Sequence, residues 1–443
     1  MYPWNKTLND WAQATGLSID ALGLVTFIGG EEMDRSIGRL MPSAYFNHLP
    51  IVGAYIVAGD RFTEKRPGYT IYNISAGIMT TELAGWFSRW LQAQSFHQVR
   101  SKVTWEWDDS RSRPRHWSTW FVSVVLISLP LHGMLIAMTV LAADWWGFAN
   151  AMAMIILVAV RCAQVSSHQA GIDTNIRMAE MEAGGPKAKS EILEQQKGAA
   201  NDRVEIQTPR NDYAKVLVVM QDSKVVTLEA PGFLIRPAFT ASPHISNRGF
   251  YLACRVIGWV AFGVHVITIG MAALHSQIYS VVLIVGASVL TGYKVGSEDS
   301  QLLRSIWNKV GDVDNESWTC WVTPRLKATV SSYPVEYTQW DSAPNNAEVL
   351  ATQDIPKKAP SWSWRRGGKK RTLTDVEHSV VRQPYQSSPV RERRQDLYAW
   401  LDLTDDEDEQ MVAWGLMPRS QKWKEVYLAK KEAHRQRSRR ETH

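Results

Sequence analysis

The sequence predicts a mainly α-helical integral membrane protein with four transmembrane helices in two parallel-repeat hairpins, a small cytosolic β-hairpin element and a partly disordered C-terminal tail. Four apolar stretches, nearly free of charge, approach the roughly 20 residues that a helix needs to cross a bilayer. They occur as two close pairs, and basic residues flank each pair on one side only. The mean hydropathy is slightly negative, because long polar segments dilute these stretches.

The apolar stretches divide the chain into parts. We expect spans at about 117–141, 146–160, 250–274 and 278–293. The resulting parts are an N-terminal cytosolic segment 1–115, a transmembrane hairpin 116–165, a cytosolic loop 166–249, a second hairpin 250–294 and a cytosolic tail 295–443. The alternative for each stretch is a helix buried in a soluble domain, but two such pairs favour lipid as the surroundings.

Basic residues near the span ends predict the orientation. They precede the first span, follow the second, precede the third and follow the fourth, whereas the links AADWW and HSQ contain neither Lys nor Arg. Both termini and the central loop are therefore expected in the cytosol, whereas the charge pattern does not identify the organelle whose membrane the helices cross. The opening MYPWNKTLNDW lacks the apolar core of a secretory signal peptide, so the first span would act as an internal signal-anchor.

An internal repeat relates the two hairpins. HGMLIAMTVL from His132 and HVITIGMAAL from His265 share the pattern His-x-x-x-Ile-small-Met-x-x-Leu at an offset of 133 residues. Because both copies begin on the cytosolic side, the repeats would be parallel, with their axis along the membrane normal. Chance matching of apolar residues is the alternative explanation.

The two histidines form a candidate intramembrane polar layer, because an imidazole in hydrocarbon needs a hydrogen-bond partner. We favour interhelical hydrogen bonding, and the alternative is a polar path for protons, a metal or a small solute, whose missing walls a homo-oligomer could supply. Four glycines of the second hairpin favour close helix packing: Gly258, Gly263, Gly270 and Gly286. The candidate partners are the other histidine, Ser123, Thr139, Thr268 or a backbone carbonyl freed near Pro130.

The three cysteines are too few and too scattered for a disulfide framework or a zinc site. Cys162 and Cys254 lie at predicted cytosolic membrane edges, which makes them candidates for palmitoylation. The alternative is that both are inert reduced thiols.

Two segments of the N-terminal part are apolar but unsuited to spanning. LPIVGAYIVAG, 49–59, is too short and is expected to form a buried strand or a re-entrant piece. TELAGWFSRWLQ, 81–92, places its large apolar residues on one helical face. That helix would either lie in the membrane interface or pack on an N-terminal domain.

The central loop contains KVLVVM-QDSK-VVTLEA, 215–230, which reads as two strands around a polar turn. A lone hairpin is marginal in water, so it should pair with further strands or with the N-terminal segment. GFLIRPAF, 232–239, is expected to supply one more strand.

In the tail, the composition of 341–390 predicts disorder. Within it lies a candidate anionic-lipid patch around Trp362 and Trp364, with a nuclear signal, RNA binding or an inert linker as alternatives. The basic residues of this patch are Lys357, Lys358, Arg365, Arg366, Lys369, Lys370 and Arg371.

The end of the tail predicts two helices. Thr404 and Glu407 have the spacing of a capping box at the start of the first helix. We therefore interpret the acidic DDEDE run as residues that stabilise the N-terminus of this helix, and not as a metal site. A basic helix should follow over about 420–440. Five apolar residues could form a mini-core or a partner-docking face: Trp400, Met411, Trp414, Trp423 and Tyr427.

RVIGWVAFGVHVITIGMAALHSQI, 255–278, and the upstream VLVVMQDSKVVTLEA, 216–230, resemble a family of fungal multi-pass integral membrane proteins of uncharacterised function. The resemblance covers roughly 115–300 and implies fungal origin and membrane placement. It implies no catalytic, metal-binding or cofactor-binding residue.

No spacing in the sequence indicates a nucleophile, base and oxyanion donor, so an enzyme is not expected, and no cofactor is expected either. The leading hypothesis is a membrane-anchored structural or interaction protein with cytosolic protein partners and tail contacts to anionic lipid. The alternative is a small transporter or channel subunit that uses the histidine layer. Nucleic acid is not favoured as a partner.

Overall fold

The computed structural model describes residues 30–108, 120–183, 213–300, 317–333 and 394–441, together with residues 7, 10 and 11. The expected disordered stretch 341–390 and the basic patch at Lys357–Arg371 lie outside the described residues, so both stay predictions.

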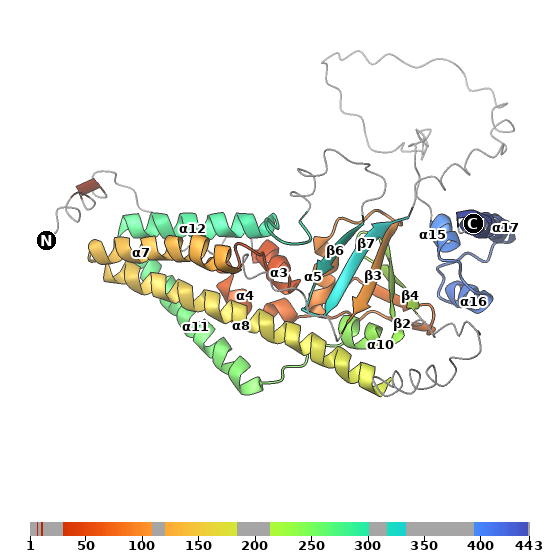
Figure 1. Cartoon of the computed structure of the whole chain (residues 1–443), viewed down its shortest axis with the longest axis horizontal. Helices are drawn as coiled ribbons and strands as arrows, with labels where there is room; N and C mark the ends of the chain where they lie inside the picture. The colour runs from red at the N-terminus through yellow and green to blue at the C-terminus, as the bar shows by residue number, and fades with distance from the viewer. Residues whose placement is uncertain are drawn as a thin grey trace, which may run out of the picture.

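Four of the described helices are long and apolar enough to cross a membrane, and Figure 1 shows them side by side at one end of the molecule. They are the continuous helix Val122–Leu141, which comprises the π-helical η2 (Val122–Ser128) and α7 (Leu129–Leu141), then α8 (Trp145–Glu182), α11 (Arg248–Met271) and α12 (Leu274–Gly292). All four expected apolar helices are therefore present. Membrane crossing itself rests on their length and composition.

Helix α8 is much longer than expected, because the apolar run predicts that the first hairpin ends at residue 165. Its 38 residues correspond to about 57 Å at 1.5 Å per residue, against about 30 Å for a hydrocarbon core. The second half packs on the sheet: Ile172 and Ile176 join the main core, and Trp107 Nε1 donates to Glu180 Oε2 at 3.0 Å. The helix continues past the apolar run because these side chains give its polar half a buried face.

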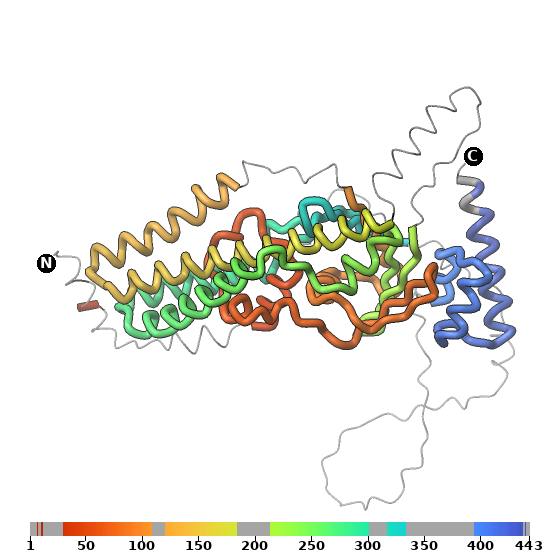
Figure 2. Tube along the Cα trace, turned by 90° about the horizontal axis from the view of Figure 1, so that it is seen from below, coloured from red at the N-terminus to blue at the C-terminus, as the bar shows by residue number. Residues whose placement is uncertain are grey.

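Within the described residues, seven strands form one sheet, in the order β2-β1-β4-β5-β3-β7-β6. The strands are β1 (Thr70–Asn73), β2 (Ile78–Thr80), β3 (Ser101–Trp107), β4 (Tyr213–Val219), β5 (Val225–Pro231), β6 (Trp318–Trp321) and β7 (Leu326–Ser332). Only the β3–β5 pair is parallel. Figures 1 and 2 place the sheet between the four long helices and the C-terminal helices. The sheet is therefore larger than the small β-hairpin element that the sequence predicts.

The expected hairpin is confirmed as β4–β5, with Val219 opposite Val225 across the turn. As expected, it does not stand alone: β4 pairs with β1 from the N-terminal segment. The extra strand expected at 232–239 is wrong. That segment forms the short helix α10 (Gly232–Leu234) and the π-helical η3 (Ile235–Thr240). Pro237 lacks the N–H that a strand ladder needs, and Phe239 is buried against an aromatic cluster instead.

The aromatic cluster belongs to α5 (Gly85–Ala93). Trp86, Phe87 and Trp90 of this helix are all buried, and Trp86 Nε1 donates to the Ala238 carbonyl at 3.0 Å. Packing on a folded domain is thus confirmed, and the alternative of an interfacial helix is wrong, because no apolar face is left for lipid.

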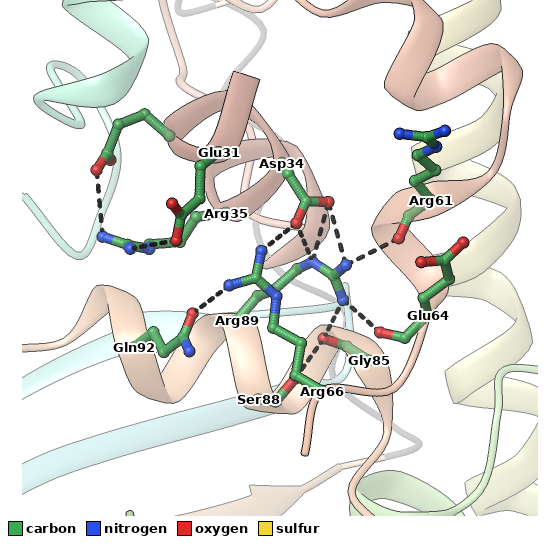
Figure 3. Close-up of polar contacts among 11 residues, drawn as sticks. Glu31, Asp34, Arg35, Arg61, Glu64, Arg66, Gly85, Ser88, Arg89 and Gln92 are labelled. Carbon is green, nitrogen blue, oxygen red and sulfur yellow. Dashed lines mark hydrogen bonds and ion pairs between the residues drawn. The ribbon is translucent and has the colours of Figure 1, made fainter. Parts of the chain in front are cut away.

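An ion-pair cluster holds α5 to the helix α3 (Gly30–Gly38) and to the 3-10 turn η1 (Arg61–Thr63), as Figure 3 shows. The buried Arg89 guanidinium contacts the Asp34 carboxylate at 3.1 Å and donates to the carbonyls of Arg61 and Glu64 at 2.8 and 2.7 Å. Arg66 pairs with the same carboxylate. Because every donor of Arg89 meets an acceptor, its burial is tolerated.

Residues 45–59 form a segment that we name the wedge, inserted among the long helices. It contains the short helix α4 (Ala54–Ala58), so the strand alternative for 49–59 is wrong. Leu49 packs on Leu283 in the middle of α12, and the Val52 N–H donates to Ser288 Oγ at 2.8 Å. Contacts at this depth favour the re-entrant alternative.

The C-terminal part forms α15 (Arg394–Trp400), α16 (Asp405–Ala413) and α17 (Gln421–Glu441). The capping box is confirmed, with Glu407 N–H donating to Thr404 Oγ1 and Thr404 N–H to Glu407 Oε2. The expected mini-core is also confirmed, and it is larger than expected, since it includes Ile74 and Leu217 from the sheet region. These helices are therefore docked on the sheet.

Candidate functional site

A cavity of about 890 Å³ lies between α8, α11 and the segment that joins η3 to α11. It lies where α11 begins and α8 leaves its apolar half. We name it the edge cavity. Polar side chains from several elements line it: Asp60, Asn175, Glu182, Arg236, Arg248 and Arg255.

A close backbone approach shapes one wall of this cavity. Gly171 of α8 lies so near the η3–α11 segment that a Cβ on it would be 2.2 Å from the His244 carbonyl oxygen. One turn further along α8, Asn175 Nδ2 donates to the Ser242 carbonyl at 3.0 Å. Together, the missing side chain and this hydrogen bond hold the segment against α8.

Another wall carries a hydrogen-bonded cluster of Asp60, Tyr251 and His168. Tyr251 donates its hydroxyl hydrogen to Asp60 Oδ1. His168 Nε2 lies 2.9 Å from the same hydroxyl and 3.7 Å from the carboxylate. His168 is buried against the ring of Phe62. Asp60 directly follows the wedge, Tyr251 belongs to α11 and His168 to α8, so the cluster joins three parts of the chain at one point.

Asp60 is held in its charged form. Burial acts to raise the pKa of this carboxyl, but hydrogen bonds from His168 and Tyr251 and the nearby Arg255 cation outweigh it and keep the pKa below its usual range. Arg255 Nη1 lies 4.0 Å from Asp60 Oδ2, and its Nε donates to the Ala58 carbonyl at 3.3 Å. The cluster therefore places the negative charge of Asp60 beside the Arg255 cation, which it partly neutralises.

The other two arginines of the cavity are differently placed. Arg236 and Arg248 are exposed, and within the described part of the chain neither side chain has a hydrogen bond or ion pair. Three guanidinium groups thus line the cavity together with two carboxylates, those of Asp60 and Glu182. The wall has a net positive charge, and two of its cations are free to bind a ligand.

The histidine layer has a different geometry from the one expected. The Nδ1–H of His265 donates to Asn150 Oδ1 at 2.6 Å, and Asn150 Nδ2 donates to Ser280 Oγ at 3.0 Å. His132 Nδ1 instead donates within its own helix, to the Ser128 carbonyl at 2.9 Å. Each imidazole thus uses Nδ1 for a different partner.

The structure therefore links α11, α8 and α12 through His265, while His132 joins no second helix through Nδ1. Asn150 was missed by sequence reasoning, although its amide is the conspicuous polar group in the apolar half of α8. The cavity beside His265 measures about 30 Å³, which is room for about one water.

The candidate palmitoylation sites are not at an open surface. Cys254 is buried, and Cys162 is half-buried with its sulfur 3.6 Å from Asn47 Nδ2. Acylation of either thiol stays a prediction and requires that thiol to become accessible. Among the described residues no group of His, Cys, Asp and Glu could hold a metal ion.

Sequence reasoning used Arg236, Arg248 and Arg255 only as orientation charges and missed their convergence on a cavity. A signal was present for two of them, because Arg248 and Arg255 are seven residues apart and so share a helical face. Asp60 and His168 gave no such signal, since only the folded chain brings them together.

Comparisons with protein-family models, curated proteins and solved structures find no match to this chain.

Proposed function

We propose that this chain is a membrane-anchored interaction protein, whose four long helices cross a bilayer as two hairpins and whose other folded parts lie in the cytosol with both termini. The exposed apolar surface of the helices carries this proposal. Soluble monomers rarely expose a contiguous apolar patch beyond a few hundred Å². Large outward side chains occur along all four helices, for example Leu126, Leu141, Val260, Ile267 and Val282.

Helix α8 supports the anchoring part of this proposal. It runs without a break from the far end of the bundle to the sheet, so the cytosolic domain would be held at a constant distance from the membrane. A continuous helix transmits position better than a flexible linker, whose ends move independently. An anchored domain of this kind suits a platform for partners.

Helix α17 supplies the surface that we assign to protein partners. Tyr427 packs inward on the C-terminal cluster, whereas Val426 and Leu428 point outward and are exposed. Because these two side chains are two positions apart on the helix, they lie on either side of the buried Tyr427 and offer a partner two separate apolar contacts. Truncation is a poor test, because removing α15 and α16 would uncover Ile74 and Leu217 of the sheet cluster.

Point variants give a sharper experiment. Val426→Asp with Leu428→Asp should reduce cytosolic partners recovered by quantitative proximity labelling by about tenfold, while the protein stays in the membrane pellet after alkaline carbonate washing. Ile78→Asp with Met79→Asp removes exposed apolar side chains from β2 and should retain the same partners. Equal partner recovery from both variants would contradict the platform, and release of the wild-type chain by carbonate would contradict the anchor.

The alternative, a small transporter or channel subunit, receives less support. The space beside His265 holds about one water, and His265 is already bonded to Asn150. If this alternative holds for an oligomer, flux in reconstituted vesicles should vanish when His132 and His265 are both replaced by alanine. Flux absent from the wild type would remove it.

A further inference from the structure

We propose that the edge cavity is a binding site for a phosphate-bearing anion, held by the guanidinium groups of Arg236, Arg248 and Arg255. The inference goes beyond the platform function, because it uses no residue of α15–α17. Its starting point is that positive groups from two separate elements, η3 and α11, converge on one hollow of about 890 Å³.

The chemistry of the lining favours phosphate over a carboxylate or a neutral ligand. A guanidinium group presents paired N–H donors in a planar fork that matches two phosphate oxygens. Arg236 and Arg248 keep these donors free within the described residues, and only Arg255 is shared, with Asp60 at 4.0 Å. A ligand of higher negative charge gains most from three such groups.

The start of α11 adds to the positive field. This helix has 24 residues and begins at Arg248, with Asn247 Oδ1 accepting the Phe250 N–H at 3.0 Å. The remaining backbone N–H groups of the first turn carry the positive end of the helix dipole. That end lies at the cavity wall that Arg248 and Tyr251 form.

Two carboxylates in the cavity lining, those of Asp60 and Glu182, act against anion binding. Asp60 is occupied by Tyr251 and His168, so its charge is already partly compensated. Glu182 also lines the cavity, and no ion pair of its side chain occurs within the described residues. Glu182 should therefore weaken anion binding, and neutralising it should strengthen binding.

The place of the cavity admits two sources of the same chemistry. Leu252 lines the cavity and is exposed, as is the neighbouring Phe250, so the apolar surface of α11 begins at the cavity itself. A lipid headgroup could enter from the bilayer, and a free phosphate compound could enter from the cytosol. Both would meet the same guanidinium groups.

The experiment uses the full-length protein in phosphatidylcholine nanodiscs. One arm titrates soluble inositol 1,4,5-trisphosphate and, separately, inorganic phosphate, with the dissociation constant measured by calorimetry. The other arm incorporates phosphatidylinositol 4,5-bisphosphate and measures lipid retained through detergent exchange by mass spectrometry. Saturable binding in either arm supports the site; binding in the lipid arm alone identifies a headgroup as the source.

Variants assign the binding to this cavity. Arg236→Gln with Arg248→Gln should weaken binding by about a hundredfold, since a charge-assisted hydrogen bond contributes about tenfold per residue. The matched control, Arg419→Gln with Lys422→Gln, removes the same charge from exposed positions elsewhere and should leave binding unchanged. Glu182→Gln should tighten binding by about threefold, a gain that misfolding cannot produce.

Three outcomes would overturn the proposal. The first is the absence of saturable binding in both arms. The second is equal loss of binding in the cavity variant and the control, which would mean attraction by overall charge alone. The third is weaker binding by the Glu182→Gln protein.

Discussion

At the scale of single residues, the long helices are joined by a few buried polar side chains. Asn150 is one of these, and its amide serves His265 on α11 and Ser280 on α12 at once. Inside a bilayer each such bond contributes on the order of 1 kcal/mol. The apolar helices associate by packing, and these bonds select which faces meet.

We predict that Asn150→Ala destabilises the bundle by about 1–2 kcal/mol, because it breaks two interhelical hydrogen bonds. The measurement is the unfolding midpoint in mixed micelles with increasing dodecyl sulfate, followed by tryptophan fluorescence. His132→Ala is the control and should have a smaller effect, since the Nδ1 bond of His132 lies within its own helix. A larger effect of His132→Ala would contradict the assigned network.

A buried charge joins the segment that follows α12 to the N-terminal domain. Asp299 pairs with Arg39, accepts from Gln94 Nε2 at 2.9 Å and lies 3.5 Å from Lys294 Nζ. Burial acts to raise the pKa of Asp299, but the charges of Arg39 and Lys294 and the hydrogen bonds outweigh it and hold the pKa below its usual range.

The depressed pKa of Asp299 predicts an acid-sensitive contribution to stability. It is fully present above the unfolded-state pKa of about 3.9 and is lost as the pH falls through the lower folded-state pKa. The stability of Asp299→Asn should therefore fall less steeply below about pH 4 than that of the wild type, in thermal melts from pH 6 to pH 2.5. Identical pH profiles would contradict this role. At neutral pH the variant should be less stable, because Arg39 stays buried without its charged partner.

At the scale of elements, the helix ends and close contacts decide how the hairpins associate. Asp144 lies in the link between α7 and α8, where Oδ1 accepts from Gly147 N–H at 2.9 Å and Oδ2 from Ala273 N–H at 3.0 Å. The Asp144 carboxylate thus caps α8 and also binds the link of the other hairpin.

The glycines expected to allow close helix packing differ from one another. Gly258 lies against Val160 and Ala58, whereas a Cβ added at Gly263, Gly270 or Gly286 would meet no atom within 4 Å.

Asp144→Ala should cost about 2 kcal/mol, since two backbone N–H groups lose their acceptor at about 1 kcal/mol each. Asn247→Ala removes a single cap, that of Phe250 N–H on α11, and should cost about half as much. Both values come from the same dodecyl sulfate titration. Equal losses for the two variants would mean that the bond to Ala273 contributes nothing.

At the scale of the whole molecule, the chain is layered along its long axis. The two links between paired helices lie at one end, and the sheet lies beyond the other end of the bundle, followed by α15–α17 (Figures 1 and 2). The wedge and α8 connect bundle and sheet. This arrangement agrees with an orientation that keeps the large segments on one side, as the flanking cations predict.

That orientation predicts labelling from opposite sides of the membrane. In sealed vesicles, Ala143→Cys in the first link and Gln421→Cys at the start of α17 should react with a membrane-impermeant maleimide from different faces. Both positions are exposed, and two of the native cysteines are buried, which keeps the background low. Reaction of both variants from the same face would contradict the orientation.

The four apolar helices, the β4–β5 hairpin and the capping box were all predictable, because each follows from a local pattern: run length, alternation around a turn, or two residues three positions apart. The remaining strands were not predicted, since β1 and β3 acquire partners from segments more than 100 residues away. The strand expected at 232–239 became helical because its apolar residues meet α5, a contact that no local pattern contains.

The candidate site divides in the same way. Composition and spacing along the chain placed cations at the ends of apolar helices, because that signal is local and additive. Tertiary structure alone brought Arg236, Arg248 and Arg255 to one cavity and Asp60 to His168, because convergence depends on how α8 and α11 pack. Local patterns thus determined the elements and the four helices long and apolar enough to cross a membrane, whereas the three-dimensional packing of distant segments decided which polar groups meet.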